Sequence, residues 1–491
     1  METTSSKSRS SLQIGKKAFL SAAFILLFLM VTAGVLTRVI PSGAYERSIE
    51  QGRELVVADS YREVEVEPPA VWRWFTAPIE VLWGSDSLTI NTIILLLVLI
   101  SGAFHILESG GILKSVLSML VQRFQGKKYL LMAMVIFFFM FTASVLGIYE
   151  GMVPMVVIVV PLAFALGWDS LTGLGMSLLA MAFGFSAAVT NPFTIGVAQK
   201  IAGLPLFSGA WLRVIFFITV YITVFLFVRN HARKVERDPS RSPLFEEEGS
   251  LRAEYAMENL AAAFRTDVLP LQLKRSIIWV AAWIGGAIVF VLVSSQIDAV
   301  SFLAFPVMGL FFFIAGIGGG FFTGMRFRRI ASVFLQGTVS ILPAILLILM
   351  AMSVKHIITL GGIMDTILFH ASEVISGTGP FAAGLLIYLL TMILNFFVAS
   401  ASAKAFLMMP ILAPLSDLVG LTRQTAVLAF DFGDGFSNML YPSNALLLIA
   451  LGFTVVSYPR WLRWTLPVQG LMLLFSVLFI FIAVQIGFGP F

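Results

Sequence analysis

The stretch that decides the fold runs from Phe430 to Asn444 and reads FDFGDGFSNMLYPSN. It contains two aspartates, two Ser-Asn pairs and a proline, yet apolar sequence flanks it on both sides, TAVLA before it and ALLLIALGF after it. Irregular, polar backbone at membrane depth is tolerated where it lines a cavity, and a proline interrupts a helix. The stretch therefore predicts a membrane helix that is broken at a binding site near the middle of the bilayer.

The composition places the chain in a membrane. Of its 491 residues, 58% are hydrophobic and only 12% are charged, and a soluble protein cannot cover its surface with so few charges. Several apolar runs of about 20 residues are long enough to cross a bilayer as helices. The lack of cysteine excludes disulfides, thiolate metal sites and cysteine nucleophiles. The net charge of +5 does not indicate a nucleic-acid partner, because the basic residues cluster in loops between the apolar runs.

The distribution of basic residues predicts the orientation of the chain. Cytoplasmic loops carry an excess of lysine and arginine, so the N-terminus is expected in the cytoplasm and the C-terminus outside, in a multi-pass protein of the inner (plasma) membrane. The basic residues of the N-terminus are Lys7, Arg9, Lys16 and Lys17. The apolar run that follows, 18–40, is longer than the core of a signal peptide and is expected to be the first membrane helix.

Two parts of the sequence match each other at an almost constant offset. At a shift of 253 residues, Pro161 falls on Pro414, Gly167 on Gly420, and Thr190-Asn191 on Ser443-Asn444; at a shift of 251, His105 falls on His356. By the count of membrane crossings, the two copies begin at opposite faces of the membrane. This arrangement predicts an inverted-topology repeat, which is typical of secondary transporters and places the binding site near the midplane.

Each copy contains an interrupted apolar run that is too short to cross the membrane twice. These runs predict two re-entrant hairpins, with tips near Gly147–Gly151 and Ser400–Lys404. The expected fold is an all-α polytopic membrane protein with about 11 transmembrane helices, an inverted-topology repeat and broken helices. Its expected parts are 1–88 (N-terminal helix and external loop), 89–228 (first repeat half), 229–274 (cytoplasmic linker), 275–457 (second repeat half) and 458–491 (C-terminal helix).

Four ionisable residues fall inside the membrane portion. Glu150, Asp431 and Asp434 are acidic, and Lys404 is their basic counterpart on the second hairpin tip. Charged residues at this depth are costly and therefore indicate function. In the functional interpretation the acids bind a cationic amine or carry a proton, while Lys404 binds a carboxylate. In the structural alternative, Lys404 and an acid form a buried pair that only holds the hairpin. Three acids against one lysine favour a cationic or zwitterionic amino acid over a dianion.

The remaining candidate residues are hydroxyl and amide side chains at the breaks and hairpin tips. They are Thr190, Asn191, Ser400, Ser402, Ser437, Asn438, Ser443 and Asn444. Asn191 and Asn444 occupy matched positions beside the two breaks, so one interpretation is that a sodium ion binds near them. No cofactor is expected. For Thr142 and Thr391, a hydrogen bond back to their own helix is the better interpretation.

Three segments resemble a known family of carriers. They are TNPFTIGVAQKIAGLPLFSG, SASAKAFLMMPILAP and FDFGDGFSNMLYPSNALLLIALGFTVVSYPRW. Together they resemble the DcuC-type C4-dicarboxylate anaerobic carriers of the ion transporter superfamily, and among these the YfcC branch of basic amino acid antiporters. The resemblance implies an inverted repeat with two re-entrant hairpins, a dimeric scaffold and elevator-like transport. The hairpin tips, Tyr149-Glu150-Gly151 and Ser400-Ala401-Ser402, differ from the Ser-Asn-Thr pattern of sodium-dicarboxylate carriers.

The sequence therefore predicts a secondary active transporter of small charged metabolites. Amino acid antiport, of the basic amino acid type, is the favoured function, with elevator-like alternating access. The alternatives are a carrier of C4-dicarboxylates or other carboxylates coupled to sodium or protons and, from another class, an ion channel. An enzyme is not expected, because the sequence contains no HExxH motif and only four histidines. The expected partners are a small-molecule substrate, the lipid bilayer and, through the resemblance, a second copy of the chain.

Overall fold

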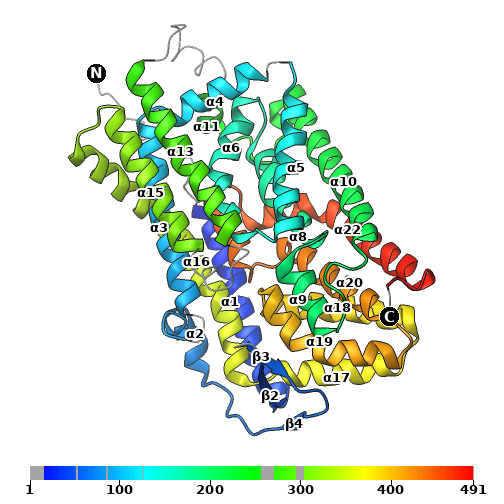
Figure 1. Ribbon diagram of the computed structural model, residues 1–491. Helices are drawn as coiled ribbons and strands as arrows, with labels where there is room; N and C mark the ends of the chain where they lie inside the picture. Colours follow the sequence, from blue (N-terminus) through cyan, green and yellow to red (C-terminus); the bar gives the residue numbers. More distant parts are fainter. Residues whose placement is uncertain are drawn as a thin grey trace.

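The chain folds almost entirely into helices, apart from four short strands near one end (Figure 1). The structure is a computed structural model that describes residues 16–50, 53–84, 87–124, 126–255, 270–294 and 304–489. In these residues eight helices are long and apolar enough to cross a membrane. They are α1 (Lys16–Val39), α3 (Ser87–Ser109), α5 (Lys128–Leu146), α10 (Ala210–Arg237), α13 (Leu271–Ser294), α16 (Phe327–Gly361), α18 (Pro380–Phe397) and α22 (Tyr458–Gln485).

The expected count of about 11 transmembrane helices is not confirmed. Besides the eight long helices, the described residues contain three shorter apolar helical segments, Met152–Ala165, Ser170–Ser186 and Pro306–Phe322. Met152–Ala165 belongs to the first hairpin and Ser170–Ser186 to the first broken helix. The number of apolar runs in the sequence therefore does not equal the number of helices that cross the membrane. The predicted all-helical membrane fold itself is confirmed.

One group of helices packs through small residues. Helix α15 (Ala304–Phe322) lies between α3 and α13, and α16 contacts both α3 and α1 (Figure 1). A Cβ added to Gly316 would lie 2.8 Å from Ala103 of α3, and one added to Gly318 would lie 2.1 Å from the Trp279 ring of α13. The glycines of α15 therefore let neighbouring helices approach closely, as small residues do in membrane proteins.

The second group contains two helical hairpins that correspond to the predicted ones. In the first, α5 ends at Gly147, whose φ of +70° requires the left-handed region that glycine tolerates, and the chain returns through the 3₁₀ turn η1 (Glu150–Met155) and α6 (Val156–Ala165). In the second, α18 ends at Phe397 and α19 (Ala401–Leu418) begins three residues after Val398. The first reversal falls at the predicted tip, whereas the second lies at residues 398–400, just before most of the predicted tip, which forms the first turn of α19.

Two broken helices lie against the hairpins and form the buried centre. The first consists of α7 (Ser170–Leu174), η2 (Gly175–Leu179), α8 (Ala180–Ser186), a break, η3 (Pro192–Gly196) and α9 (Val197–Ile201). The second consists of α20 (Arg423–Gly435), η5 (Phe436–Met439), a break and α21 (Ala445–Gly452). All residues of α8 and α21 are buried. The predicted break of the helix within 430–444 is confirmed.

Shorter elements cover the two ends of the molecule. At one end lie α4 (Ile112–Arg123), η4 (Pro239–Arg241) and α11 (Gly249–Tyr255). At the other lie α2 (Val71–Glu80), α17 (Met364–Ser376) and two antiparallel strand pairs: β1 (Gly43–Ala44) with β4 (Arg62–Glu63), and β2 (Arg47–Glu50) with β3 (Arg53–Val56) (Figure 1).

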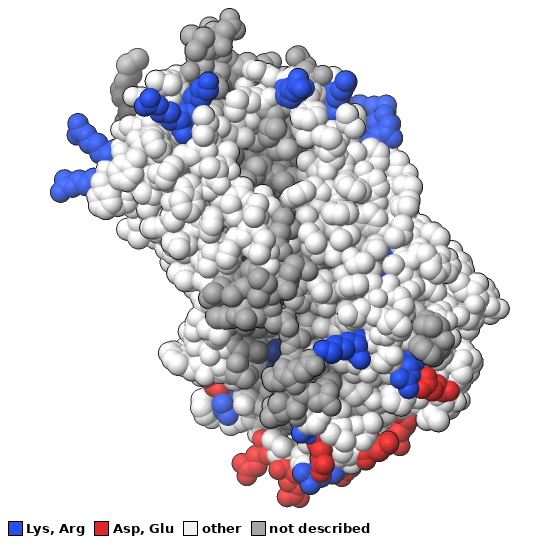
Figure 2. All heavy atoms as spheres, viewed as in Figure 1, with Lys and Arg blue, Asp and Glu red and all other residues white. Residues whose placement is uncertain are grey.

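The charge on the surface differs between these ends. In the view of Figure 2 the end that carries α4 and α11 shows lysine and arginine, whereas acidic side chains gather at the end that carries the strands and α17. This asymmetry agrees with the positive-inside rule. It supports the predicted cytoplasmic position of the N-terminus, which stays a prediction, as do the expected part boundaries.

Candidate functional site

The two breaks are held to their own hairpins by equivalent hydrogen bonds. The Thr190 hydroxyl donates to the Val145 carbonyl at 3.0 Å, and the Ser443 hydroxyl donates to the Phe396 carbonyl at 2.7 Å. These donors and acceptors are the residues that the shifts of 253 and 251 place on one another. The sequence repeat is therefore also a repeat of contacts.

The asparagines that follow these hydroxyls cap the next helical segment. The Asn191 side-chain oxygen accepts from the Phe193 amide at 2.9 Å, and the Asn444 side-chain oxygen accepts from the Leu446 amide at 2.9 Å. Each cap supplies a partner for a helix-end N–H that would otherwise have none. The side chain of Asn191 also occupies the space beside Gly147, because a Cβ there would lie 2.3 Å from the Asn191 oxygen.

Lys404 is at the centre of a buried polar network in the second copy. Its side chain is fully buried and forms an ion pair with the Asp434 carboxylate, which is 1% exposed. The Lys404 ammonium also donates to the Asn395 side-chain oxygen and, at 2.7 Å, to the Val398 carbonyl at the end of α18. Helix α19 therefore brings a positive charge to the broken helix, and α20 supplies the negative one.

Asn395 connects this ion pair to the other predicted residues of the second break. Its side-chain nitrogen lies 2.6 Å from the Ser437 hydroxyl and 3.0 Å from the Asn438 side-chain oxygen. That oxygen also accepts from the Asn444 side-chain nitrogen at 2.8 Å. Five predicted site residues thus form one continuous network: Lys404, Asp434, Ser437, Asn438 and Asn444.

Asn395 itself was missed by sequence reasoning. It is a single amide in the apolar run TMILNFFV, and the 251-residue shift places it on Ser144. Ser144 has the corresponding position in the first copy, where its hydroxyl accepts from the Val189 amide and donates to the Ala187 carbonyl. A polar side chain at the same place in both copies was the signal available.

Asp431 faces a different part of the protein from Asp434. Its neighbours are the Thr194 hydroxyl, the Ala188 backbone and the Arg213 guanidinium. Its carboxylate is fully buried among these groups, and no ion pair joins it to a basic residue of the described structure. Asp431 thus lies against the first break, and the two acids of one helix serve two different places.

Arg213 was also missed, and it changes the charge balance of the site. Its side chain is 1% exposed and donates to the carbonyls of Val189 at 3.0 Å and Ser208 at 2.8 Å. It stands alone in the apolar start of α10, AWLRVIFF, which was the signal for it. Two buried basic residues, Lys404 and Arg213, therefore face Asp434 and Asp431, so the expected ratio of three acids to one lysine left out one buried base.

The hairpin-tip residues have separate positions. The Ser402 hydroxyl donates to the Phe193 carbonyl at 2.9 Å, so it links the second hairpin to the first break. Ser400 caps α19 by accepting from the Ala403 amide at 3.4 Å, and its side chain is exposed. The side chain of Glu150 lies outside the described part of the structure. A sodium ion near Asn191 and Asn444 stays a prediction, as does the set of substrate-binding residues.

The structural interpretations of the two membrane threonines are confirmed. The Thr142 hydroxyl donates to the Phe138 carbonyl at 2.9 Å, and the Thr391 hydroxyl donates to the Ile387 carbonyl at 2.8 Å. Both bonds run to the preceding turn of the same helix. These threonines therefore need no ligand to satisfy their hydrogen-bonding groups.

Comparison with known proteins gives a consistent assignment. The model of the family described as C4-dicarboxylate anaerobic carrier, DcuC, matches residues 19–485. An Escherichia coli K12 protein named "Putative basic amino acid antiporter YfcC" is 32% identical over 413 residues, 82% of this chain and 80% of that protein. An uncharacterised protein of Haemophilus influenzae is 27% identical over 391 residues, 79% of this chain and 74% of that protein.

Two solved transporters also align with the chain. The Alcanivorax borkumensis YdaH transporter is 18% identical with a TM-score of 0.42, over 96% of this chain and 100% of that chain. Neisseria gonorrhoeae MtrF is 15% identical with a TM-score of 0.43, over 94% of each chain. Scores this low give no basis for assigning a fold or a function to this chain. The family model, by contrast, extends over both hairpins, both broken helices and the helices around them, and the chain belongs to the C4-dicarboxylate anaerobic carrier family of transporters.

Proposed function

We propose that this transporter exchanges amino acids, of the basic class, across the membrane as a secondary active antiporter and does not act as an enzyme. The observation that carries the proposal is the buried Lys404–Asp434 ion pair, which lies in the polar network of the second break. The Escherichia coli relative is named as a basic amino acid antiporter, and that name favours the basic class.

The charge of the ion pair favours a substrate that has both signs. Removing one partner of a buried pair is costly, because the other charge then stays buried and unpaired. A zwitterionic amino acid avoids this cost: its carboxylate takes the place of Asp434 beside Lys404, and its amine takes the place of Lys404 beside Asp434. A dicarboxylate would place a second negative charge near Asp434 instead.

Asp431 gives a place for a further positive charge. Its carboxylate is buried, with the Thr194 hydroxyl and the Arg213 guanidinium as neighbours, and a buried carboxylate within the membrane indicates a role in binding a cation or a proton. In the proposed mechanism Asp431 binds the side-chain cation of a basic amino acid or carries the coupling proton. The positively charged Arg213 side chain lies near this carboxylate, so the first break has charges of both signs.

The proposed transport motion is elevator-like. The hairpins and broken helices are tied together by the bonds of Thr190, Ser443 and Ser402, so they are suited to move as one body. Helices α1, α3, α13, α15 and α16 pack mainly on one another and are the proposed static scaffold. This scaffold is also the proposed contact between two copies in a homodimer.

A carboxylate carrier is the second candidate. Lys404 and Arg213 supply two buried positive charges near the breaks, and the family is described by its C4-dicarboxylate carriers. In this alternative a sodium ion or a proton neutralises one aspartate while the substrate carboxylates bind the basic residues. An ion channel is the remaining alternative.

Uptake into proteoliposomes distinguishes these functions. The purified protein is reconstituted into vesicles, and uptake of radiolabelled arginine is compared between vesicles that contain unlabelled lysine and vesicles that are empty. We expect uptake that requires the internal amino acid and that succinate does not inhibit. Succinate uptake driven by a sodium or proton gradient, without arginine exchange, would establish the carboxylate carrier instead. Arginine flux that needs no internal substrate and no gradient, together with a measured conductance, would establish the channel.

A further inference from the structure

A basic pocket lies between α10 and α22. It has a volume of about 710 Å³ and is lined on one side by the C-terminal half of α10 and on the other by the first turns of α22. Its basic lining residues are His231, Lys234, Arg460 and Arg463, and its aromatic ones are Phe227 and Trp464. The two aromatic rings lie 4.8 Å apart, centroid to centroid.

The pocket has positive charge that its acidic neighbours do not cancel. His231 contacts Asp169 at 2.9 Å, and Arg460 forms an ion pair with Glu247 at 2.5 Å. Lys234 and Arg463 form no ion pair with any acidic residue that the structure describes. The first turn of α22 adds the positive end of a long helix dipole near Arg460. The pocket is therefore suited to an anion.

The two helices that frame the pocket present apolar side chains to their surroundings. On α10 these exposed residues include Ile218, Ile222 and Leu226, and on α22 they include Leu466, Leu471 and Leu474. In a membrane protein such faces contact lipid chains. The basic groups lie at the helix ends, where the headgroups of a bilayer are found, and tryptophan is enriched at the same level.

We propose that this pocket binds the phosphate headgroup of an anionic phospholipid, whose acyl chains lie along the exposed faces of α10 and α22. Basic pockets between transmembrane helices are suited to such headgroups. A lipid fits better than a free phosphate ion, because the lipid uses both the basic pocket and the apolar helix faces beside it. The proposal does not depend on which substrate is transported.

The bound lipid would connect two parts of the protein. Arg463 belongs to α22 and Lys234 to α10, so one headgroup bridges both helices. His231, on the pocket wall, also contacts Asp169, which caps α7 at the start of the first broken helix. Occupation of the pocket therefore stabilises the end of the molecule from which that broken helix begins.

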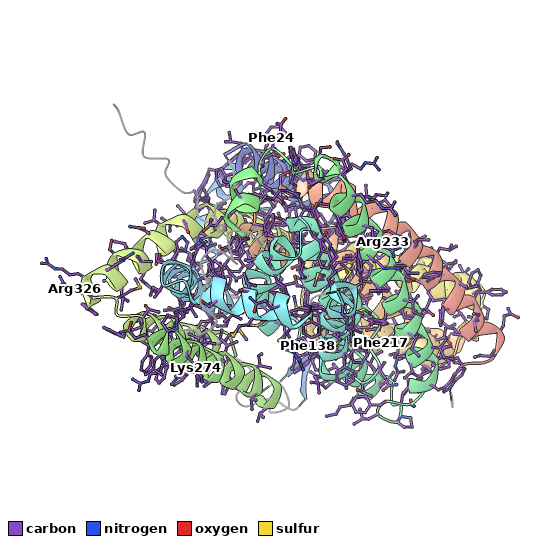
Figure 3. The ribbon with its side chains drawn as sticks, turned by 90° about the horizontal axis from the view of Figure 1, so that it is seen from above. Phe24, Phe138, Phe217, Arg233, Lys274 and Arg326 are labelled. Atoms are coloured by element: carbon purple, nitrogen blue, oxygen red, sulfur yellow. The ribbon has the colours of Figure 1, made fainter. Side chains whose placement is uncertain are left out.

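The test compares two double variants by native mass spectrometry of the full-length protein. The test variant is Lys234→Gln/Arg463→Gln. The matched control is Lys274→Gln/Arg326→Gln, two exposed basic residues that lie away from α10 and its Arg233 when the molecule is seen from above (Figure 3). Each protein is titrated with phosphatidylglycerol and with phosphatidylcholine in detergent.

The wild type and the control are expected to bind phosphatidylglycerol more tightly than phosphatidylcholine. The test variant is expected to bind phosphatidylglycerol about 25-fold more weakly, since each of the two basic residues near a headgroup contributes about fivefold. Equal phosphatidylglycerol affinity in test and control variants would overturn the proposal. So would equal binding of the two lipids by the wild type.

Two further measurements separate a lipid from a soluble anion and guard against misfolding. Inorganic phosphate is titrated into the wild type while its thermal unfolding is followed; stabilisation equal to that by phosphatidylglycerol would show a soluble-anion site and reject the lipid. The single variant Arg463→Lys keeps the charge and is expected to keep phosphatidylglycerol binding within a few-fold of the wild type. If it loses binding as fully as the double glutamine variant, charge is not the basis of recognition and the proposal is wrong.

Discussion

Removing the charges of Lys404 and Asp434, singly and together, tests whether they act as a pair. Lys404→Met keeps most of the side-chain volume, and Asp434→Asn keeps the shape of the carboxylate. Both native side chains are at most 1% exposed, so each single variant leaves the opposite charge buried without its partner. Breaking a buried pair in this way costs about 3–5 kcal/mol, and each single variant should show that loss in the free energy of unfolding.

The double variant should behave differently from the sum of its parts. With both charges gone, no unpaired ion remains, and replacing a buried pair by neutral groups is often neutral or stabilising. We therefore expect the double variant to unfold within about 1 kcal/mol of the wild type, as measured by thermal unfolding of the purified proteins, while amino acid exchange in proteoliposomes is lost. Additive destabilisation would refute the pairing. A stable double variant that exchanges arginine normally would refute the role of the pair in binding.

Three other changes give further tests. Asp431→Asn removes the buried carboxylate at the first break. It should abolish arginine exchange if that group binds the substrate amine, or abolish only pH-driven accumulation if it carries the proton. Normal transport in both assays would contradict either role. Burial and the negative charge of Asp169 raise the pKa of Glu248 from 4.5 to about 8. Between pH 4.5 and 8, Glu248 therefore loses its proton in the unfolded chain but keeps it in the folded protein. Its stability should therefore fall by a few kcal/mol as the pH rises from about 4.5 to 8, and Glu248→Gln should flatten this dependence in unfolding scans. Thr190→Val and Ser443→Ala each remove one hydrogen bond between a break and its hairpin. Each variant should therefore lower the free energy of unfolding by about 1 kcal/mol. A loss of stability in only one of the two variants would contradict the equivalence of the two bonds.

The local interruptions of the fold were predictable because they depend on the residues at the interruption. Gly147 ends α5 with a positive φ, and Asn191 and Asn444 cap the segments after the breaks. Glycine and asparagine act through the backbone beside them. Their effect can therefore be predicted without knowledge of distant contacts. The internal repeat gave independent support for each break, because the matching residues of the other copy predict a break at the same place.

The partners of the buried charges were not predictable in the same way. Asp431 and Asp434 are three residues apart, a spacing that places side chains on the same side of a helix. In the structure nearly all residues of α20 are buried, so side chains on every face of this helix meet protein. The two aspartates point in somewhat different directions around the helix axis, and Asp431 therefore meets the first break whereas Asp434 meets Lys404. Arg213 and Asn395 reach the site from helices distant in sequence, and no local pattern states which neighbour a lone polar residue will meet.

The matched caps at the two breaks have a consequence for how such a carrier changes its substrate. Asn191 and Asn444 do the same structural work, but the repeat positions of Asp431 and Asp434 in the first copy are occupied by Leu178 and Met181. Duplication thus left two similar frames, and only the second has aspartates on the helical segment before its break. Selection for a new cargo can alter these aspartates while the first frame preserves the geometry of the breaks. A change of specificity is then expected to collect its mutations in the second half of the chain.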